Sequence, residues 1–152
     1  MRVSVIGGSV VDESTYGTAR ELGVLLGAHG HELVCGGLGG VMEAVCQGAR
    51  ERGGHTIGIL PGSDRGAANE YVETPITTGM GNARNALVVL NGDAAVAIDG
   101  GTGTLSELAL ARDYGRPVAG LDTHRVPDVG IEHVETPRAA LEYVERAVRA
   151  SR

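Results

Sequence analysis

The sequence predicts an α/β fold in which helices cover a mostly parallel β-sheet. Short apolar runs alternate along the 152 residues with longer segments whose apolar side chains recur at helical spacing, an order typical of strand–helix–strand units. Glycine-rich turns follow three of the short runs, after Ile6, Cys35 and Ile98. We therefore expect one domain over residues 1–152, a Rossmann-like three-layer sandwich that binds its ligand where these turns converge.

The first strand and helix are predicted close to the N-terminus. Val3–Ile6 is apolar and runs into Gly7-Gly8-Ser9, so we interpret it as a strand and not as part of a signal peptide. Thr15–Ala28 carries leucines at helical spacing, and Thr18 with Glu21 forms a candidate capping pair inside this helix.

The next three elements continue the alternation. Glu32–Cys35 is a short strand, Val41–Arg52 is a helix, and Thr56–Leu60 is a third strand. The pair Gly53-Gly54 marks the end of the helix, since glycine commonly follows the last helical residue. The polar, small residues from Ser63 to Glu70 predict a loop.

The second half of the chain repeats the same units. Strands are predicted at Val72–Thr77, Ala94–Ile98, Pro117–Leu121 and Ile131–Val134. Helices are predicted at Asn82–Leu90, Thr104–Tyr114 and from Pro137 to Ala150. The run Ala94–Ile98 is apolar on both faces, as a central parallel strand should be. Thr136 and Pro137 are typical first residues of a helix, so the last helix begins there.

Composition excludes several classes of function. The net charge is −6, which argues against nucleic acid as the main partner, and no apolar run approaches the ~20 residues of a membrane span. All 13 basic residues are arginine, so the lysine that a P-loop or a pyridoxal phosphate enzyme requires is absent. Two cysteines make no disulfide framework, so we expect a cytoplasmic location. The five histidines show no H-E-x-x-H spacing, and no metal site is expected.

The segment Asp99–Glu107, DGGTGTLSE, predicts a phosphate-binding loop. Its small residues let backbone N–H groups approach an anion at a helix N-terminus. The candidate phosphate ligands are Gly100, Gly101, Thr102, Gly103 and Thr104. The alternative is a tight strand–helix turn with no ligand. Ser106 stands where G-x-G-x-x-G requires its third glycine, so a nicotinamide dinucleotide enzyme is not expected.

Two charged residues near this loop each allow two interpretations. Glu107 follows Thr104 in a T-x-x-E capping box, yet a carboxylate at this place can also face a sugar carbon and support glycosidic bond cleavage. Arg84 is either a solvated surface charge or a ligand for a phosphate or nucleobase. The pattern alone decides neither case.

The two other glycine turns supply further candidate ligand-binding residues. These are Gly8, Ser9, Gly36, Gly37, Gly40 and Met42. Packing is the alternative for Met42. Cys35, at the end of its strand, is expected to line the same crevice, and Cys46 is expected in the core.

These motifs resemble those of the Lonely Guy (LOG) family, also labelled lysine decarboxylase-like. Asp99–Glu107 is similar to its P-G-G-x-G-T-x-x-E signature, and Cys35–Glu43 is similar to its G-G-G-x-x-G-L-M-G segment. The resemblance implies a nucleoside 5′-monophosphate phosphoribohydrolase, which needs no cofactor and releases base and ribose 5-phosphate. It also implies that Gly100–Thr104 holds the 5′-phosphate, that Glu107 supports ribosyl cleavage and that Arg84 positions the nucleotide.

The chain also departs from the LOG pattern. Asp99 replaces a proline, Asn85 replaces a lysine, and Cys35 and Glu43 replace glycines. The sequence looks closer to a sister branch of the SLOG superfamily, which includes the molybdenum-cofactor carriers and proteins related to DprA. That branch implies an alternative, a non-catalytic carrier of molybdopterin or a nucleotide sensor.

Either resemblance implies a small phosphorylated nucleotide or pterin as the partner. It also implies a homo-oligomer, a dimer or a tetramer. The apolar run Ala86–Leu90 can supply an interface, or it can belong to the core.

Overall fold

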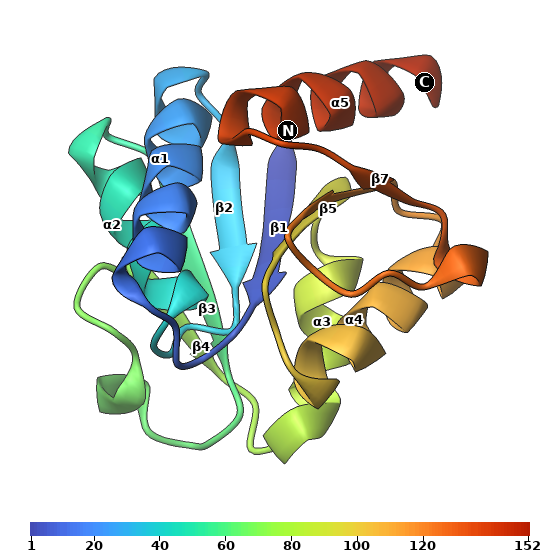
Figure 1. Ribbon diagram of the computed structural model, residues 1–152. Coiled ribbons are helices and arrows are strands. Elements are labelled where there is room, and N and C mark those ends of the chain that lie inside the picture. The colour runs from blue at the N-terminus through green and yellow to red at the C-terminus, as the bar shows by residue number, and fades with distance from the viewer.

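The protein, described over residues 1–152 by a computed structural model, is built around one parallel sheet (Figure 1). Its seven strands are β1 Arg2–Gly7, β2 Glu32–Cys35, β3 Thr56–Leu60, β4 Thr74–Thr77, β5 Ala94–Ile98, β6 Val118–Leu121 and β7 Ile131–His133. They lie in the order β4-β3-β2-β1-β5-β6-β7, and every neighbouring pair is parallel. The predicted α/β class is confirmed.

Helices cover both faces of the sheet (Figure 1). They are α1 Glu13–Ala28, α2 Val41–Glu51, α3 Asn85–Leu90, α4 Thr102–Asp113 and α5 Pro137–Ala150. Two apolar clusters fill the interior: α1, α2 and α5 pack on one face of the sheet, while α3 and α4 pack on the other. This is the three-layer sandwich that the sequence predicts. None of the helices combines the length with the apolar composition that crossing a membrane requires.

The order of the strands reverses between β1 and β5. The chain moves outward from β1 through β2 and β3 to β4, and then returns to place β5 on the other side of β1. Gly7 pairs with Ile98 at the carboxyl ends of these two strands. In parallel α/β sheets this reversal opens a crevice at the carboxyl edge, so it is the expected place for a ligand.

Helices α1 and α4 both begin two residues earlier than predicted. Helix α1 begins at Glu13 because the Asp12 carboxylate accepts the Thr15 N–H at 2.8 Å, and Thr18 instead donates its hydroxyl to the Ser14 carbonyl. Helix α4 begins at Thr102, two residues before the expected start. The Thr136 cap of α5 is confirmed, since its hydroxyl accepts the Ala139 N–H at 3.1 Å.

The segment expected as one helix at residues 82–90 has two parts. Gly81–Arg84 forms a 3₁₀ turn, and α3 follows it from Asn85. In the apolar run of this helix, Val88 and Val89 are fully buried in the core, whereas Leu90 is 45% exposed. The run therefore serves the core in part, and a role in an oligomer interface stays a prediction.

Glycines allow α1 and α2 to pack at close range. A Cβ atom added to Gly48 of α2 would lie 2.0 Å from the Arg20 carbonyl oxygen, and one added to Gly23 of α1 would lie 2.1 Å from the Val45 carbonyl oxygen. Both positions meet rigid backbone, so a larger residue must push the helices apart.

Gly48→Ala should therefore lower the free energy of unfolding by about 1–3 kcal/mol, the usual cost of overpacking. Gly17 of α1 is the matched control, because a Cβ atom there meets nothing within 4 Å. Gly17→Ala should raise stability by about 0.5–1 kcal/mol. Urea denaturation of the two variants measures both values, and equal midpoints would contradict the close packing.

Candidate functional site

A cleft of about 340 Å³ lies at the carboxyl ends of the strands, where their order reverses. Its walls come from the turn after β1, the turn after β2, the 3₁₀ turn before α3 and the start of α4. The lining residues are Val5, Ile6, Gly7, Gly8, Ser9, Gly36, Leu38, Met42, Asn82, Arg84, Asn85, Gly101, Thr102, Gly103, Thr104 and Glu107. Segments far apart in the sequence thus meet around one space.

The N-terminus of α4 forms one wall of the cleft. Gly101 occupies the N-cap position without a side-chain cap, and the Leu105 N–H, which donates to the Gly101 carbonyl at 3.1 Å, is the first to find a partner in the helix. The N–H groups of Thr102, Gly103 and Thr104 precede it and have no intrahelical acceptor. Together with the helix dipole, such free N–H groups favour an anion.

The N-terminus of α2 approaches the same region from the turn after β2. The Val41 N–H donates to the Gly8 carbonyl at 2.9 Å, and a Cβ atom added to Gly40 would lie 2.2 Å from that same oxygen. Only a residue without a side chain permits this contact. The positive ends of two helix dipoles therefore flank the cleft, which makes its potential favourable for a negative group.

Arg84 is held inside the cleft by the backbone of β3. It is only 8% exposed, its Nε donates to the Ile59 carbonyl at 2.9 Å, and its Nη1 donates to the Asn85 side-chain oxygen. The guanidinium lies against Gly36, where an added Cβ atom would come within 2.7 Å of Nη2. The interpretation of Arg84 as a solvated surface charge is wrong.

Glu107 lies on the wall formed by α4 and is 8% exposed. Because α4 starts at Thr102, Glu107 falls in its second turn, and no side chain caps the helix. The predicted capping box is therefore wrong. Burial raises the pKa of Glu107 to about 7, against the opposing effect of the Arg84 guanidinium. A carboxyl group with this pKa can both accept and donate a proton near neutral pH.

Most of the candidate ligand-binding residues meet in this cleft, but three glycines and Cys35 do not line it. Gly37 packs against Leu60, Gly40 packs against the turn after β1, and Gly100, with φ +114°, packs against the Thr104 side chain. These glycines let the turns pack closely against neighbouring residues, but they are not in contact with the cleft. Cys35 is fully buried, with its Sγ atom 3.6 Å from that of Cys46. The expectation that Cys35 lines the crevice is wrong.

Sequence reasoning missed six lining residues, which are Val5, Ile6, Gly7, Leu38, Asn82 and Asn85. Asn85 has the clearest role, because its side-chain oxygen accepts from Arg84 and its Nδ2 lies 3.4 Å from the Ser106 hydroxyl. It thus links the arginine to α4. In the sequence, its position directly after Arg84 could have indicated this role.

The Asp99 carboxylate belongs to a neighbouring cleft. That space, of about 290 Å³, opens at the ends of β5 and β6 and is lined by Asp99 and Asp122 together with polar residues of α1 and the β6–β7 connection. Asp99 is absent from the lining of the cleft that holds Arg84 and Glu107. The carboxylate nevertheless lies close to the first cleft, because a Cβ atom added to Gly8, which lines that cleft, would lie 2.8 Å from Asp99 Oδ2.

Comparison with known proteins identifies the family. A model of the SLOG cluster4 family matches residues 1–150. The chain belongs to the SLOG cluster4 family. It is 42% identical over 143 residues to an uncharacterized protein of Archaeoglobus fulgidus, covering 94% of this chain and 93% of that protein. The predicted resemblance to LOG-like Rossmann proteins is confirmed.

A more distant relative carries a named activity. The chain is 39% identical over 93 residues to a protein of Oryza sativa subsp. japonica named "Probable cytokinin riboside 5′-monophosphate phosphoribohydrolase". The match covers 59% of this SLOG cluster4 chain and 41% of the rice protein. The chain thus matches less than half the length of that relative.

Solved structures of two other proteins share the fold over nearly their full length. The molybdenum cofactor binding protein of Rippkaea orientalis has a TM-score of 0.90 at 33% identity, covering 97% of this chain and 96% of that one. The molybdenum cofactor carrier protein of Chlamydomonas reinhardtii has a TM-score of 0.86 at 33% identity, covering 98% of each chain.

The raised pKa of Glu107 predicts how stability changes with pH. An ordinary glutamate titrates at 4.5, whereas Glu107 in the folded protein titrates at about 7. Between these values the folded state holds the proton that the unfolded state has released, so this contribution to stability is present at low pH and is lost as the pH rises to about 7.

Glu107→Gln should remove this loss and stabilise the protein at pH 8 by about 1–3 kcal/mol relative to the native chain. Denaturant unfolding at pH 5 and pH 8 measures the difference. Glu142→Gln, at an exposed position on α5, is the control and should follow the native curve. Equal pH dependence in both variants would show that Glu107 titrates as an ordinary carboxyl.

Proposed function

We propose that this SLOG cluster4 protein binds a nucleoside 5′-monophosphate and hydrolyses its N-glycosidic bond. The observation that carries the proposal is Glu107, a buried carboxyl whose pKa of about 7 suits proton transfer, in the same cleft as Arg84 and the free N–H groups of α4. The match to a plant protein named as a phosphoribohydrolase supports the same chemistry.

Each part of the cleft has a task in this reaction. The 5′-phosphate accepts hydrogen bonds from the first N–H groups of α4, with the hydroxyls of Thr102 and Thr104 as further donors. The Arg84 guanidinium, fixed by Ile59 and Asn85, offers its remaining N–H groups to the nucleotide. Binding of the phosphate by α4 and of the rest of the nucleotide by Arg84 holds the ribose beside Glu107.

Glu107 acts on the ribosyl carbon in its ionised form. The bond from C1′ to the base breaks, and positive charge that develops on the ribose is stabilised by the carboxylate. A water molecule forms the new C1′–O bond and passes one proton to Glu107, while the departing base leaves with the bonding electron pair and takes up a proton from solvent. Glu107 then releases its proton to solvent, which returns it to the ionised form. The products are the free base and ribose 5-phosphate.

The test is release of free base from AMP, GMP and CMP, followed by chromatography. Glu107→Gln should lower the rate by about 10²–10⁴-fold, the range of a lost acid–base group. The exposed control Glu142→Gln should keep the native rate. If the native protein releases no base from any of the three, or if Glu107→Gln remains equally active, the proposal is wrong.

The full-length likeness to the two molybdenum cofactor proteins supports a second candidate, a carrier that holds a phosphorylated pterin without cleaving it. Such a ligand would place its phosphate on the same α4 N–H groups. Freshly purified protein should then release a fluorescent pterin on denaturation. Pterin release with no base release favours the carrier, and base release with no pterin favours the hydrolase.

A further inference from the structure

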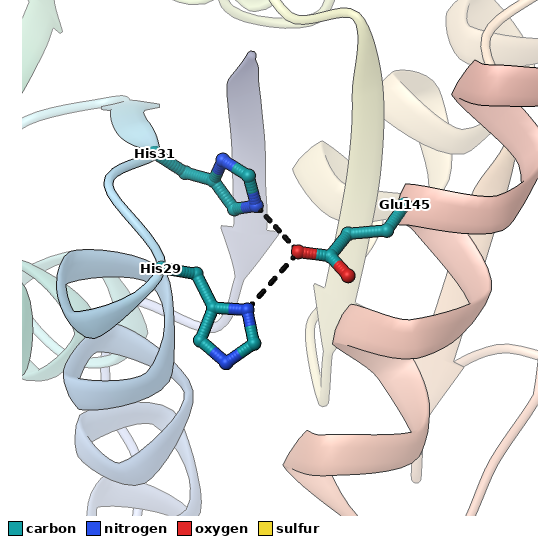
Figure 2. Close-up of side chains that lie close together, drawn as sticks. All are labelled: His29, His31 and Glu145. Carbon is teal, nitrogen blue, oxygen red and sulfur yellow. Dashed lines mark hydrogen bonds and ion pairs between the residues drawn. The ribbon is translucent and has the colours of Figure 1, made fainter.

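A second cluster of functional side chains lies at the opposite edge of the sheet from the cleft. His29 ends α1, His31 directly precedes β2, and Glu145 projects from α5 toward both rings (Figure 2). The Glu145 Oε1 atom lies 3.1 Å from His29 Nδ1 and 2.8 Å from His31 Nε2. Three segments that the fold brings together thus present two imidazoles and a carboxylate to one point.

We propose that His29, His31 and Glu145 bind a divalent transition-metal ion of the zinc class. Imidazole nitrogen and carboxylate oxygen are both ligands of Zn²⁺, and three protein ligands with a water in the fourth position is an established arrangement. The three ligating atoms lie within 4.8 Å of one another. In a tetrahedral site with ligand distances near 2.1 Å, ligand atoms are roughly 3.4 Å apart, so small side-chain rotations complete the geometry.

The backbone between the two histidines prepares this arrangement. Gly30 adopts φ +71°, a left-handed conformation that reverses the chain between α1 and β2. The reversal places Nδ1 of one ring and Nε2 of the other on the same side, facing α5 (Figure 2). Each ring can offer a lone pair at that nitrogen by carrying its proton on the other nitrogen.

The surroundings leave space for the ion and its water. His31 and Glu145 line a shallow hollow of about 170 Å³, and the His29 side chain is 40% exposed. Two arginines, Arg149 and Arg152, line the same hollow, and the Arg149 guanidinium, on a side chain that is 75% exposed, lies 3.7 Å from the other Glu145 oxygen. Because it is exposed to solvent, the Arg149 charge is screened, and its contact with Oε2 leaves Oε1 to the metal. The bound ion would fasten α5 to the turn between α1 and β2.

The test is calorimetric titration of tag-free protein with Zn²⁺. The native chain should bind one ion, and His31→Ala should weaken binding by more than about 10-fold, the smallest effect expected even for an outer-shell partner. His55→Ala, which removes an exposed histidine hydrogen-bonded to Thr74, is the matched control and should bind as the native chain does. Arg149→Gln should tighten binding by about 2- to 5-fold, because it removes a nearby positive charge.

Two further readouts distinguish this site from metal binding at the cysteines. Zn²⁺ should raise the melting temperature of the native chain and of His55→Ala, but not that of Glu145→Gln, each compared with its own metal-free form. Co²⁺ should give visible bands of nitrogen and oxygen ligation. A thiolate-to-cobalt band would assign the metal to Cys35 and Cys46, and it would overturn the proposal, as would equal Zn²⁺ affinity in His31→Ala and His55→Ala.

Discussion

The close approach of backbone segments at the carboxyl ends of β1 and β5 is the constraint on which the cleft depends. Gly7 pairs with Ile98 there, and a Cβ atom on Gly7 would lie 2.2 Å from the Ile98 carbonyl oxygen. The same turn admits the start of α2, whose Gly40 packs against the Gly8 carbonyl. Side chains at these points would push α2 away and widen the space beside α4. The glycines therefore set the cleft's dimensions without having to touch a ligand.

Burial governs the electrostatics of the site. Arg84 and Glu107 are each 8% exposed, and burying either charge alone is costly. Burial lowers the pKa of Arg84, against the opposing effect of Glu107, while hydrogen bonds to the Ile59 carbonyl and the Asn85 side chain fix its orientation. At Glu107, the positive charge of Arg84 lowers the pKa, but burial raises it by more. The pKa of Glu107 therefore rises. One charge is thus fixed, while the other responds to pH and to whatever enters the cleft.

Much of the fold could be predicted from local sequence, and the site could be predicted only in part. The bounds of β2, β3 and β5 follow directly from short apolar runs that are followed by a glycine, a proline and an aspartate, respectively. The start of α4 was misplaced because Thr104 and Glu107 match a capping box, whereas the helix begins earlier, at the glycine turn. No periodic pattern of apolar residues could predict that Arg84 is buried, because it lies in a single 3₁₀ turn. Its hydrogen-bond partner, the Ile59 carbonyl, belongs to a strand that is distant in sequence. A local glycine turn therefore decides the start of α4, whereas non-local pairing decides the position of Arg84.

The His29, His31 and Glu145 cluster shows the same limit at the other edge of the sheet. Glu145 lies 116 residues after His29 and 114 residues after His31, so no local spacing in the sequence predicts that they are in contact. It forms because α5 packs on the same sheet face as α1, which places the end of α1 beside α5 (Figure 1). An ion there would tie the last helix to the start of β2 and leave the carboxyl edge untouched. If both proposals hold, the ion would affect stability at the amino ends of the strands, and the cleft with Arg84 and Glu107 would keep its geometry at the carboxyl ends.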